Sequence, residues 1–181
     1  MFKWLDDNPQ KEERTGLFVT LDGEEIRIAT PDDDFILGIV SACPSVIGDV
    51  YNDQWKNMFL RDIFDREITQ EIDVPEQTTE IADPENPEKT ITQVICEAYK
   101  EIVPILNPEY DNTQKYIPRS ERPEWEVVGL LGKLVAVDDG TCKVNGWCKV
   151  GKGGVATKSE KRTQFRVMSR LDKNHIRVLI L

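Results

Sequence analysis

The chain has 181 residues and a formal net charge of −10, with 33 acidic side chains against 23 lysines and arginines. This length is sufficient for one domain with a hydrophobic core, and the negative charge argues against nucleic acid or an acidic membrane surface as a partner. No apolar run approaches the roughly 18 residues of a membrane helix, and the first ten residues are too polar for a signal peptide. We therefore expect a soluble protein that is not exported. A single histidine, His175, and four cysteines without metal-type spacing predict no metal site.

The charges are unevenly distributed along the chain. Residues 62–101 carry twelve acidic and three basic side chains, whereas residues 129–181 carry four acidic and eleven basic ones. Two solvated surfaces of opposite sign would give this pattern. The same pattern would arise if the acidic and basic regions contact each other, within one chain or between copies in an oligomer.

The first local signal is "GLFVTLDGEEIRIA" at residues 16–29. Asp22-Gly23 suits a two-residue hairpin turn, which would pair Val19 with Ile26 and Leu17 with Ile28. That register puts the four apolar side chains on one face, so turn chemistry and alternation both predict a β-hairpin.

The following apolar run, residues 35–48, predicts a buried strand that is interrupted at Pro44. Ser41 and Ser45 lie in this run without a visible base nearby, and we expect them to form local hydrogen bonds rather than to act as nucleophiles.

A short helix is predicted after this run. Trp55, Phe59 and Ile63 recur at helical spacing, and Asn52 or Asp53 could cap the helix.

Residues 66–115 contain five prolines and no glycine, with a polar centre at "ADPENPEK". This composition predicts an inserted acidic β-arm of two long strands whose tip lies near Pro84–Pro87. The rival interpretation is a helix at residues 91–103, where apolar residues follow an i, i+3, i+4, i+7 pattern. The β-branched residues and flanking prolines favour strands.

The strap "YIPRSERPEW", residues 116–125, follows the arm. Its two prolines fix an extended path, and Tyr116 and Trp125 would anchor it on a surface. Arg119 and Arg122 are expected to pair with acids of the arm or of a neighbouring chain.

The final third has the glycine-punctuated pattern of β structure. Asn145-Gly146 predicts a hairpin that opposes Lys143 to Cys148. Cys142 would then face away from Cys148, so no disulfide is expected between them. Residues 163–170 and 175–181, joined by "DKN", predict a terminal hairpin.

No catalytic motif emerges from the residues alone. "GKGGVATKS" at residues 151–159 lacks the spacing and the following helix of a phosphate-binding P-loop, so a flexible basic turn is predicted. Neighbouring carboxylates such as Asp6-Asp7 and Asp138-Asp139 are not embedded in apolar sequence that would raise a pKa. The fold class that we predict is mainly β, a compact antiparallel β domain with an inserted extended β-arm and little helix.

The order of segments resembles one known family. Residues 2–29, 35–49, 106–146 and 170–179 are similar to the C-terminal intramolecular-chaperone, self-cleaving domain of bacteriophage neck-appendage and tail-spike proteins, classed with glutamic-type peptidases. "YIPRSERPEW" followed by "GLLGKL" is the most specific part, and the arm is the least similar.

This resemblance implies a single chaperone domain over residues 1–181 that registers an upstream β-helical spike as a homotrimer and then cuts itself free. Cleavage in the family is attributed to an Asp-x-x-Glu pair, with the Glu directly ahead of the position of Met1. No residue of this chain inherits that role, so catalytic residues are expected to be absent and the chain inactive alone. The domain would act in the host cytoplasm during assembly and be missing from the mature virion.

The resemblance also suggests contact residues. ATP is a candidate cofactor by family resemblance only, with no other cofactor expected, and the basic turn would then contact its phosphates. The candidate phosphate contacts are Lys149, Lys152 and Lys158. The candidate trimer or strap contacts are Trp4, Arg119, Arg122 and Trp125.

Two alternative functions were considered. One is a self-cleaving enzyme with a Ser–Lys dyad at Ser41 or Ser169, which no spacing motif supports. The other is a structural or receptor-binding spike-tip domain that is retained on the virion.

Overall fold

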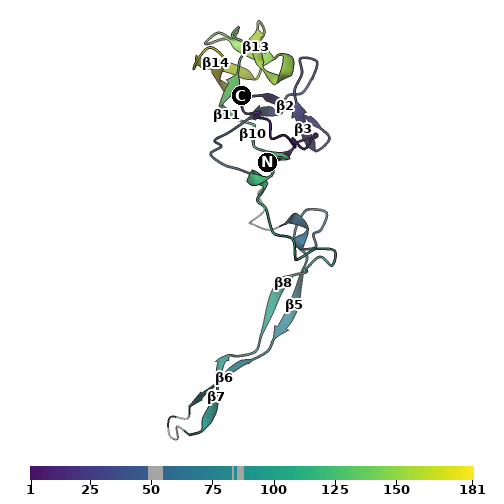
Figure 1. Cartoon of the computed structure of the whole chain (residues 1–181), viewed down its shortest axis with the longest axis vertical. Helices are drawn as coiled ribbons and strands as arrows, with labels where there is room; N and C mark the ends of the chain where they lie inside the picture. Colours follow the sequence, from purple (N-terminus) through teal and green to yellow (C-terminus); the bar gives the residue numbers. More distant parts are fainter. Residues whose placement is uncertain (49–54, 83, 85–87) are drawn as a thin grey trace. The chain divides into compact units, whose positions relative to one another are not determined.

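A computed structural model describes residues 1–48, 55–82, 84 and 88–181 (Figure 1). The chain divides into two units: unit 1 comprises Met1–Asn52 and Ile117–Leu181, and unit 2 comprises Asp53–Tyr116. Antiparallel pairing dominates both units, and the helical elements in the described ranges are three short 3₁₀ turns, Lys56–Met58, Arg119–Glu121 and Lys152–Gly154. The mainly β fold class predicted from the sequence is confirmed.

The first sheet of unit 1 has four strands in the order β10-β4-β2-β3. Its strands are β2 (Phe18–Asp22), β3 (Glu25–Ile28), β4 (Gly38–Val40) and β10 (Val128–Gly129). The predicted strand at residues 35–48 is therefore reduced to three residues. Beyond it Val46 and Ile47 are exposed, because the proline-containing segment leaves the sheet.

The β2–β3 hairpin forms with a register that differs from the predicted one. Val19 pairs with Ile28 and Leu21 with Ile26, so the two loop residues are Gly23 and Glu24. Gly23 has a φ of 62°, and a positive φ at the first loop position is the type II′ arrangement that favours glycine there. The shift is two residues, so the predicted apolar face is preserved.

The second sheet of unit 1 has five strands in the order β11-β15-β14-β12-β13. They are β11 (Gly132–Val137), β12 (Trp147–Val150), β13 (Ala156–Ser159), β14 (Phe165–Arg170) and β15 (His175–Ile180). The terminal hairpin predicted from residues 163–181 is present as β14 and β15.

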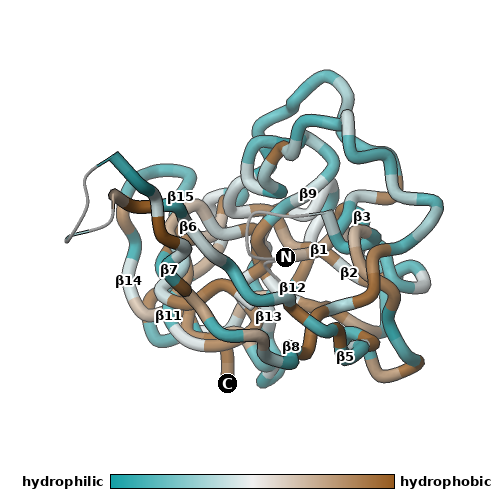
Figure 2. The backbone as a smooth tube through the Cα atoms, turned by 90° about the horizontal axis from the view of Figure 1, so that it is seen from below, coloured by the Kyte–Doolittle hydropathy of each residue, from teal (hydrophilic) through white to brown (hydrophobic). Residues whose placement is uncertain are grey.

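The two sheets pack through one hydrophobic core. The rings of Phe18 and Phe165, one from each sheet, meet edge to face with centroids 4.8 Å apart, and Ile39 joins the same buried cluster. In Figure 2 the hydrophobic stretches (brown) lie among the labelled strands, whereas the loop at the top of the view is largely hydrophilic (teal). Burial of this cluster is the main contribution to the stability of unit 1.

The hairpin predicted at Asn145-Gly146 is wrong. The turn itself forms, since Asn145 has a φ of 63° and the Gly146 N–H donates to Lys143 O at 2.9 Å. However, β12 pairs with β13 and β14 instead of with residues before the turn. Cys142 and Cys148 are consequently not on opposite faces: both are buried free thiols in one core cluster. The pKa of Cys142 is raised, mainly by a hydrogen bond with the Cys148 thiol and to a smaller extent by burial.

The short helix predicted around Trp55 is also wrong. Only Lys56–Met58 forms a 3₁₀ turn, after which Phe59 bridges to Leu106 and Arg61 to Glu67 in β fashion. The proposed caps, Asn52 and Asp53, lie outside the described residues.

Unit 2 contains the predicted β-arm. β5 (Thr69–Val74) pairs with β8 (Tyr99–Pro104), and β6 (Gln77–Ala82) pairs with β7 (Thr90–Cys96). Residues 91–103 are therefore strand rather than helix, as their β-branched content favours. The last pair of the β6–β7 ladder is Ala82 with Thr90. Of the tip predicted at Pro84–Pro87, only Pro84 is described.

Candidate functional site around the N-terminus

The N-terminus is held in a short ladder. β1 (Phe2–Lys3) pairs antiparallel with β9 (Trp125–Glu126). The next residue, Trp4, is completely buried, and its backbone N–H donates to Glu124 O at 2.8 Å. Two segments that are distant in sequence therefore meet at the first residues of the chain, and Trp4 fixes their position.

A polar cluster covers Trp4. The guanidinium of Arg14 lies over the Trp4 ring, and its nitrogens bind Asp6 Oδ1 at 2.9 Å, Asp6 Oδ2 at 2.6 Å and Glu12 Oε2 at 3.0 Å. Arg14 is 6% exposed, and its hydrogen bonds hold the pKa of Asp6 below its ordinary value. Trp4 is predicted as a trimer or strap contact. Its backbone contacts the strap at Glu124, and the trimer contact stays a prediction.

The strap centres on Trp125. The guanidinium carbon of Arg119 lies 3.7 Å and that of Arg122 5.5 Å from the centre of the Trp125 ring, and Arg122 also lies 3.6 Å from Glu124. These contacts join strap residues to one another, and the expected pairing of Arg119 and Arg122 with acids of the arm or of a neighbouring chain stays a prediction. Trp125 is half-buried rather than fully buried. The other anchor, Tyr116, packs edge to face on Trp55 in unit 2, with ring centroids 5.5 Å apart.

Glu126 is a residue that the sequence reasoning missed. Burial raises the pKa of this carboxyl, and the charge of Glu13 raises it further. The backbone N–H of Val127, which donates to the carboxyl, and the charge of Arg14 oppose the shift. Its partner across the ladder is Phe2, so a carboxyl with a raised pKa lies beside the first residues of the chain. The signal in the sequence was the position of Glu126 between Trp125 and a long apolar run, where solvent is excluded.

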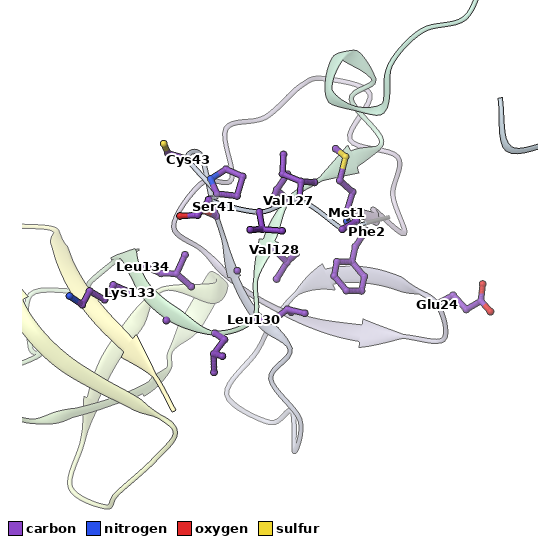
Figure 3. A pocket seen from close by; sticks show the side chains of 18 residues that line it. Met1, Phe2, Glu24, Ser41, Cys43, Val127, Val128, Leu130, Lys133 and Leu134 are labelled. Atoms are coloured by element: carbon purple, nitrogen blue, oxygen red, sulfur yellow. Dashed lines mark hydrogen bonds between the residues drawn. The ribbon is translucent and has the colours of Figure 1, made fainter. Parts of the chain in front are cut away.

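A groove lies next to this ladder (Figure 3). It has a volume of about 890 Å³ and is lined by Met1, Phe2, Glu24, residues 41–48 other than Ala42, and residues 127–134. Met1 and Phe2 lie near Val127 and Val128 in Figure 3, and the Met1 ammonium donates to Gly48 O at 2.8 Å. The lining is mainly apolar, so the groove suits an extended segment with apolar side chains.

The groove also contains the serine of the alternative Ser–Lys dyad. Ser41 and Lys133 both line it, but in Figure 3 the Lys133 amine points away from Ser41. No hydrogen bond joins the two side chains in the described part of the chain. Ser169, the other candidate, lies in β14 of the core sheet.

The basic turn places its lysines apart. Lys149 pairs across the β12–β13 ladder with Thr157, and Lys158 with Cys148, so strand alternation sends the two lysines to opposite faces. Lys158 also binds Glu160 Oε1 at 2.6 Å. Lys152 lies in the exposed 3₁₀ turn. Phosphate binding by these three lysines stays a prediction.

One acidic pair differs from its predicted environment. The sequence around Asp138-Asp139 is not apolar, yet Asp138 is completely buried, where Arg170 pairs with it and the Cys142 N–H donates to its Oδ1 at 3.3 Å. This arrangement joins two strands of the core and is structural. Within the described ranges, no group of three or more potential metal ligands is found, and no helix is long and apolar enough to cross a membrane.

Comparison with protein families decides which family has this architecture. The model described as "Peptidase_G2, IMC autoproteolytic cleavage domain" matches residues 1–174. The chain belongs to this family. The match covers the four-stranded sheet, unit 2 and the five-stranded sheet up to β15, which begins at His175, so the resemblance seen in the sequence is confirmed.

Relatives of this chain include phage appendage proteins. The preneck appendage protein of Bacillus phage PZA is 33% identical over 144 residues, and the pre-neck appendage protein of Bacillus phage phi29 is 32% identical over 143 residues. Each match covers 79% of this chain but 14% of the relative. The chain therefore spans about one seventh of the length of these curated relatives.

Solved structures show the same fold. The pre-mature bacteriophage phi29 gene product 12 matches with a TM-score of 0.69 at 26% identity, over 99% of this chain and 20% of that one. The C-terminal fragment of the same gene product matches with a TM-score of 0.68 at 25% identity, over 99% of this chain and 96% of the fragment. The Peptidase_G2 chain described here thus corresponds in extent to that fragment.

Proposed function

We propose that this domain is an intramolecular chaperone that assembles a phage neck-appendage or tail-spike protein as a homotrimer and is released by self-cleavage at its N-terminal junction. The observation that carries the proposal is family membership over residues 1–174, joined to an N-terminus that is anchored beside a groove and a carboxyl of raised pKa.

The arm supports assembly into an oligomer. In the β5–β8 ribbon, Ile72 and Val74 share one face with their cross-strand neighbours, which include Tyr99, and Ile72 and Tyr99 are 38% and 47% exposed. A two-stranded ribbon is marginally stable on its own in water, and packing against copies of itself would bury this face. A homotrimer would supply the copies. The net acidity of residues 62–101 and the net basicity of residues 129–181 would contribute attraction between copies.

The N-terminal junction supports cleavage. Two nearby carboxyls can divide the work of hydrolysis, one accepting a proton from the attacking water and the other donating a proton to the leaving amide nitrogen. The family's Asp-x-x-Glu pair would precede Met1 directly and would be held by the β1–β9 ladder. Glu13 and Glu126 are acidic side chains at this ladder, and their negative charge would raise the pKa of a nearby acid.

This function implies a partner for the domain and a place where it acts. The upstream partner would be the β-helical spike domain of the same parent chain, and the work would be done in the host cytoplasm before the mature virion leaves. ATP is carried as a candidate ligand for release, with Lys149, Lys152 and Lys158 as the basic side chains available to phosphate.

The decisive test restores the cleavage acids. The 181-residue chain is expected to keep its intact mass on prolonged incubation, whereas a chain with Asp-x-x-Glu and a few spike residues placed before Met1 should cut before that Asp, and only as a trimer. A specific internal fragment from the 181-residue chain would move the active site into residues 1–181 and overturn the proposal. Mass spectrometry of mature virions distinguishes the two functions: peptides of this domain should be absent if it is a released chaperone and present if it is a retained spike-tip domain.

A further inference from the structure

The strand that holds the N-terminus has two edges with different neighbours. β9 and β10 are consecutive parts of one extended segment, Trp125–Gly129. β1 lies along it at β9 and β4 lies along it at β10. Backbone groups of successive residues in a strand point to opposite edges. The position of each residue in this alternation therefore determines which edge its backbone N–H and C=O face.

Two hydrogen bonds assign the edges. The Ser41 N–H donates to Val127 O at 2.9 Å, on the edge of β4, and the Trp4 N–H donates to Glu124 O at 2.8 Å, on the edge of β1. The alternation then directs the N–H and C=O of Val128 to the same edge as those of Glu124 and Glu126. β1 occupies that edge only as far as Glu126.

The register identifies what would lie opposite Val128. Phe2 pairs with Glu126, so Met1 is opposite Val127 and the residue immediately preceding Met1 in a longer chain is opposite Val128. Consistently, the Met1 nitrogen points to the other side and donates to Gly48 O at 2.8 Å. A chain arriving from upstream would thus pass between Gly48 and Val128.

The groove of Figure 3 follows this path. Among the residues that line it, Val46, Ile47 and Leu131 are 87%, 43% and 76% exposed. A contiguous patch of exposed apolar side chains marks a surface that can bind a partner. An extended segment would cover them while it completes the hydrogen bonding of Val128.

We propose that the segment immediately preceding Met1 in a longer parent chain binds in this groove by strand addition, its last residue pairing with Val128. The inference rests on the proposed function, in which the domain is attached to an upstream spike. Pairing covers about two residues, because β10 ends at Gly129. It would hold the junction extended, which is the form in which a peptide bond is accessible to hydrolytic groups.

Hydrogen exchange tests this pairing directly. The chain is extended before Met1 by the neutral segment Gly-Ser-Thr-Val-Thr-Val, and amide exchange is followed by NMR in the extended and the 181-residue chains. We expect the Val128 amide to exchange roughly tenfold or more slowly in the extended chain, and the amide of the added valine next to Met1 to be protected. The Gly129 amide, which faces β4, should not change. Equal exchange of Val128 in both chains, with an unprotected valine, would falsify the proposal.

Two proline variants of the extension sharpen the test. Proline directly before Met1 removes the N–H that would donate to Val128 O, one of the two hydrogen bonds of this pair, so the protection of the Val128 amide should be reduced. Proline one position further upstream removes an N–H on the opposite edge, so protection should be kept. Equal effects of the two variants would contradict the register. The neutral extension has no cleavage acids, so its protection is measured independently of self-cleavage. If the extension is protected but the chain with restored acids does not cut itself, this inference stands and the proposed function is wrong. If the restored chain cuts itself but the extension is not protected, the proposed function stands and this inference is wrong.

Discussion

The guanidinium carbon of Arg14 lies 4.5 Å from the centre of the Trp4 ring. The first buried side chain of the domain is therefore covered by a cation that Asp6 and Glu12 hold in place. The Arg14 side chain is 7% exposed, which strengthens its contact with the Trp4 ring, whereas the side chains of Asp6 and Glu12 are 58% and 61% exposed.

Replacing Arg14 by alanine should destabilise unit 1 by about 2–4 kcal/mol, because it exposes Trp4 and leaves the Asp6 carboxylate without its partner. Urea unfolding followed by tryptophan fluorescence measures the change. Lys173→Ala, at an exposed turn position, is the control and should change stability by less than about 0.5 kcal/mol. An equally small effect of Arg14→Ala would show that the cluster does not anchor the N-terminus.

Trp125→Ala should cost about 1–3 kcal/mol. Full burial of this ring would predict more, but it is half-buried and its other contacts are the guanidiniums of Arg119 and Arg122. Trp125→Phe keeps the stacking surface and should recover most of the loss. A cost that is the same for alanine and phenylalanine would rule out stacking as the source of stability.

Glu126→Gln should make stability less dependent on pH. The pKa of Glu126 is raised by burial in the folded state, so its charged form opposes folding, and wild-type stability from this group rises as the pH falls through the folded pKa. The variant should be more stable than wild type near pH 7, and its advantage should shrink toward about pH 4. Urea midpoints across this range provide the measurement, with Glu24→Gln as the control. An advantage that grows at low pH would contradict the assigned direction.

The two faces of the β5–β8 ribbon offer a matched pair of variants. Ile72→Asp places a charge on the face shared with Tyr99, and Ile102→Asp places one on the opposite face, beside Glu71. If the first face is buried between copies, Ile72→Asp should lower the mass seen by light scattering from trimer to monomer, and Ile102→Asp should not. A monomeric wild-type chain, or equal effects of both variants, would exclude this face as the trimer contact.

Local chemistry in the sequence predicted the strands but not all their neighbours. The hairpin next to Asp22-Gly23, with its register shifted by two residues, the proline-rich arm and the terminal hairpin were recognisable because turn residues and alternation act within a few residues. Asn145-Gly146 formed its turn as well, but β12 found better partners in β13 and β14. Competition of this kind depends on packing between distant segments, which a short pattern does not contain.

The candidate site was harder to predict for the same reason. The sequence indicates Trp4, Arg119, Arg122 and Trp125 as trimer or strap contacts, and the trimer contact stays a prediction. The position of Arg14 over Trp4 depends on packing between segments that no short pattern contains. Asp138 is buried beside Arg170, which lies 32 positions further along the chain, so no local pattern indicates its burial. Glu126 became notable only when the ladder that buries it was known.

Unit 1 is built from the two ends of the chain, and this has a consequence for the order of events during synthesis. Phe2 pairs with Glu126, and the core also needs β15, whose last residue is Ile180. A ribosome must therefore release nearly the whole domain before the first residues find their partners, and closing so long a loop makes this pairing late. An N-terminal junction that becomes ordered only then would remain uncut in every truncated chain, so the timing of folding would itself act as a check on completeness.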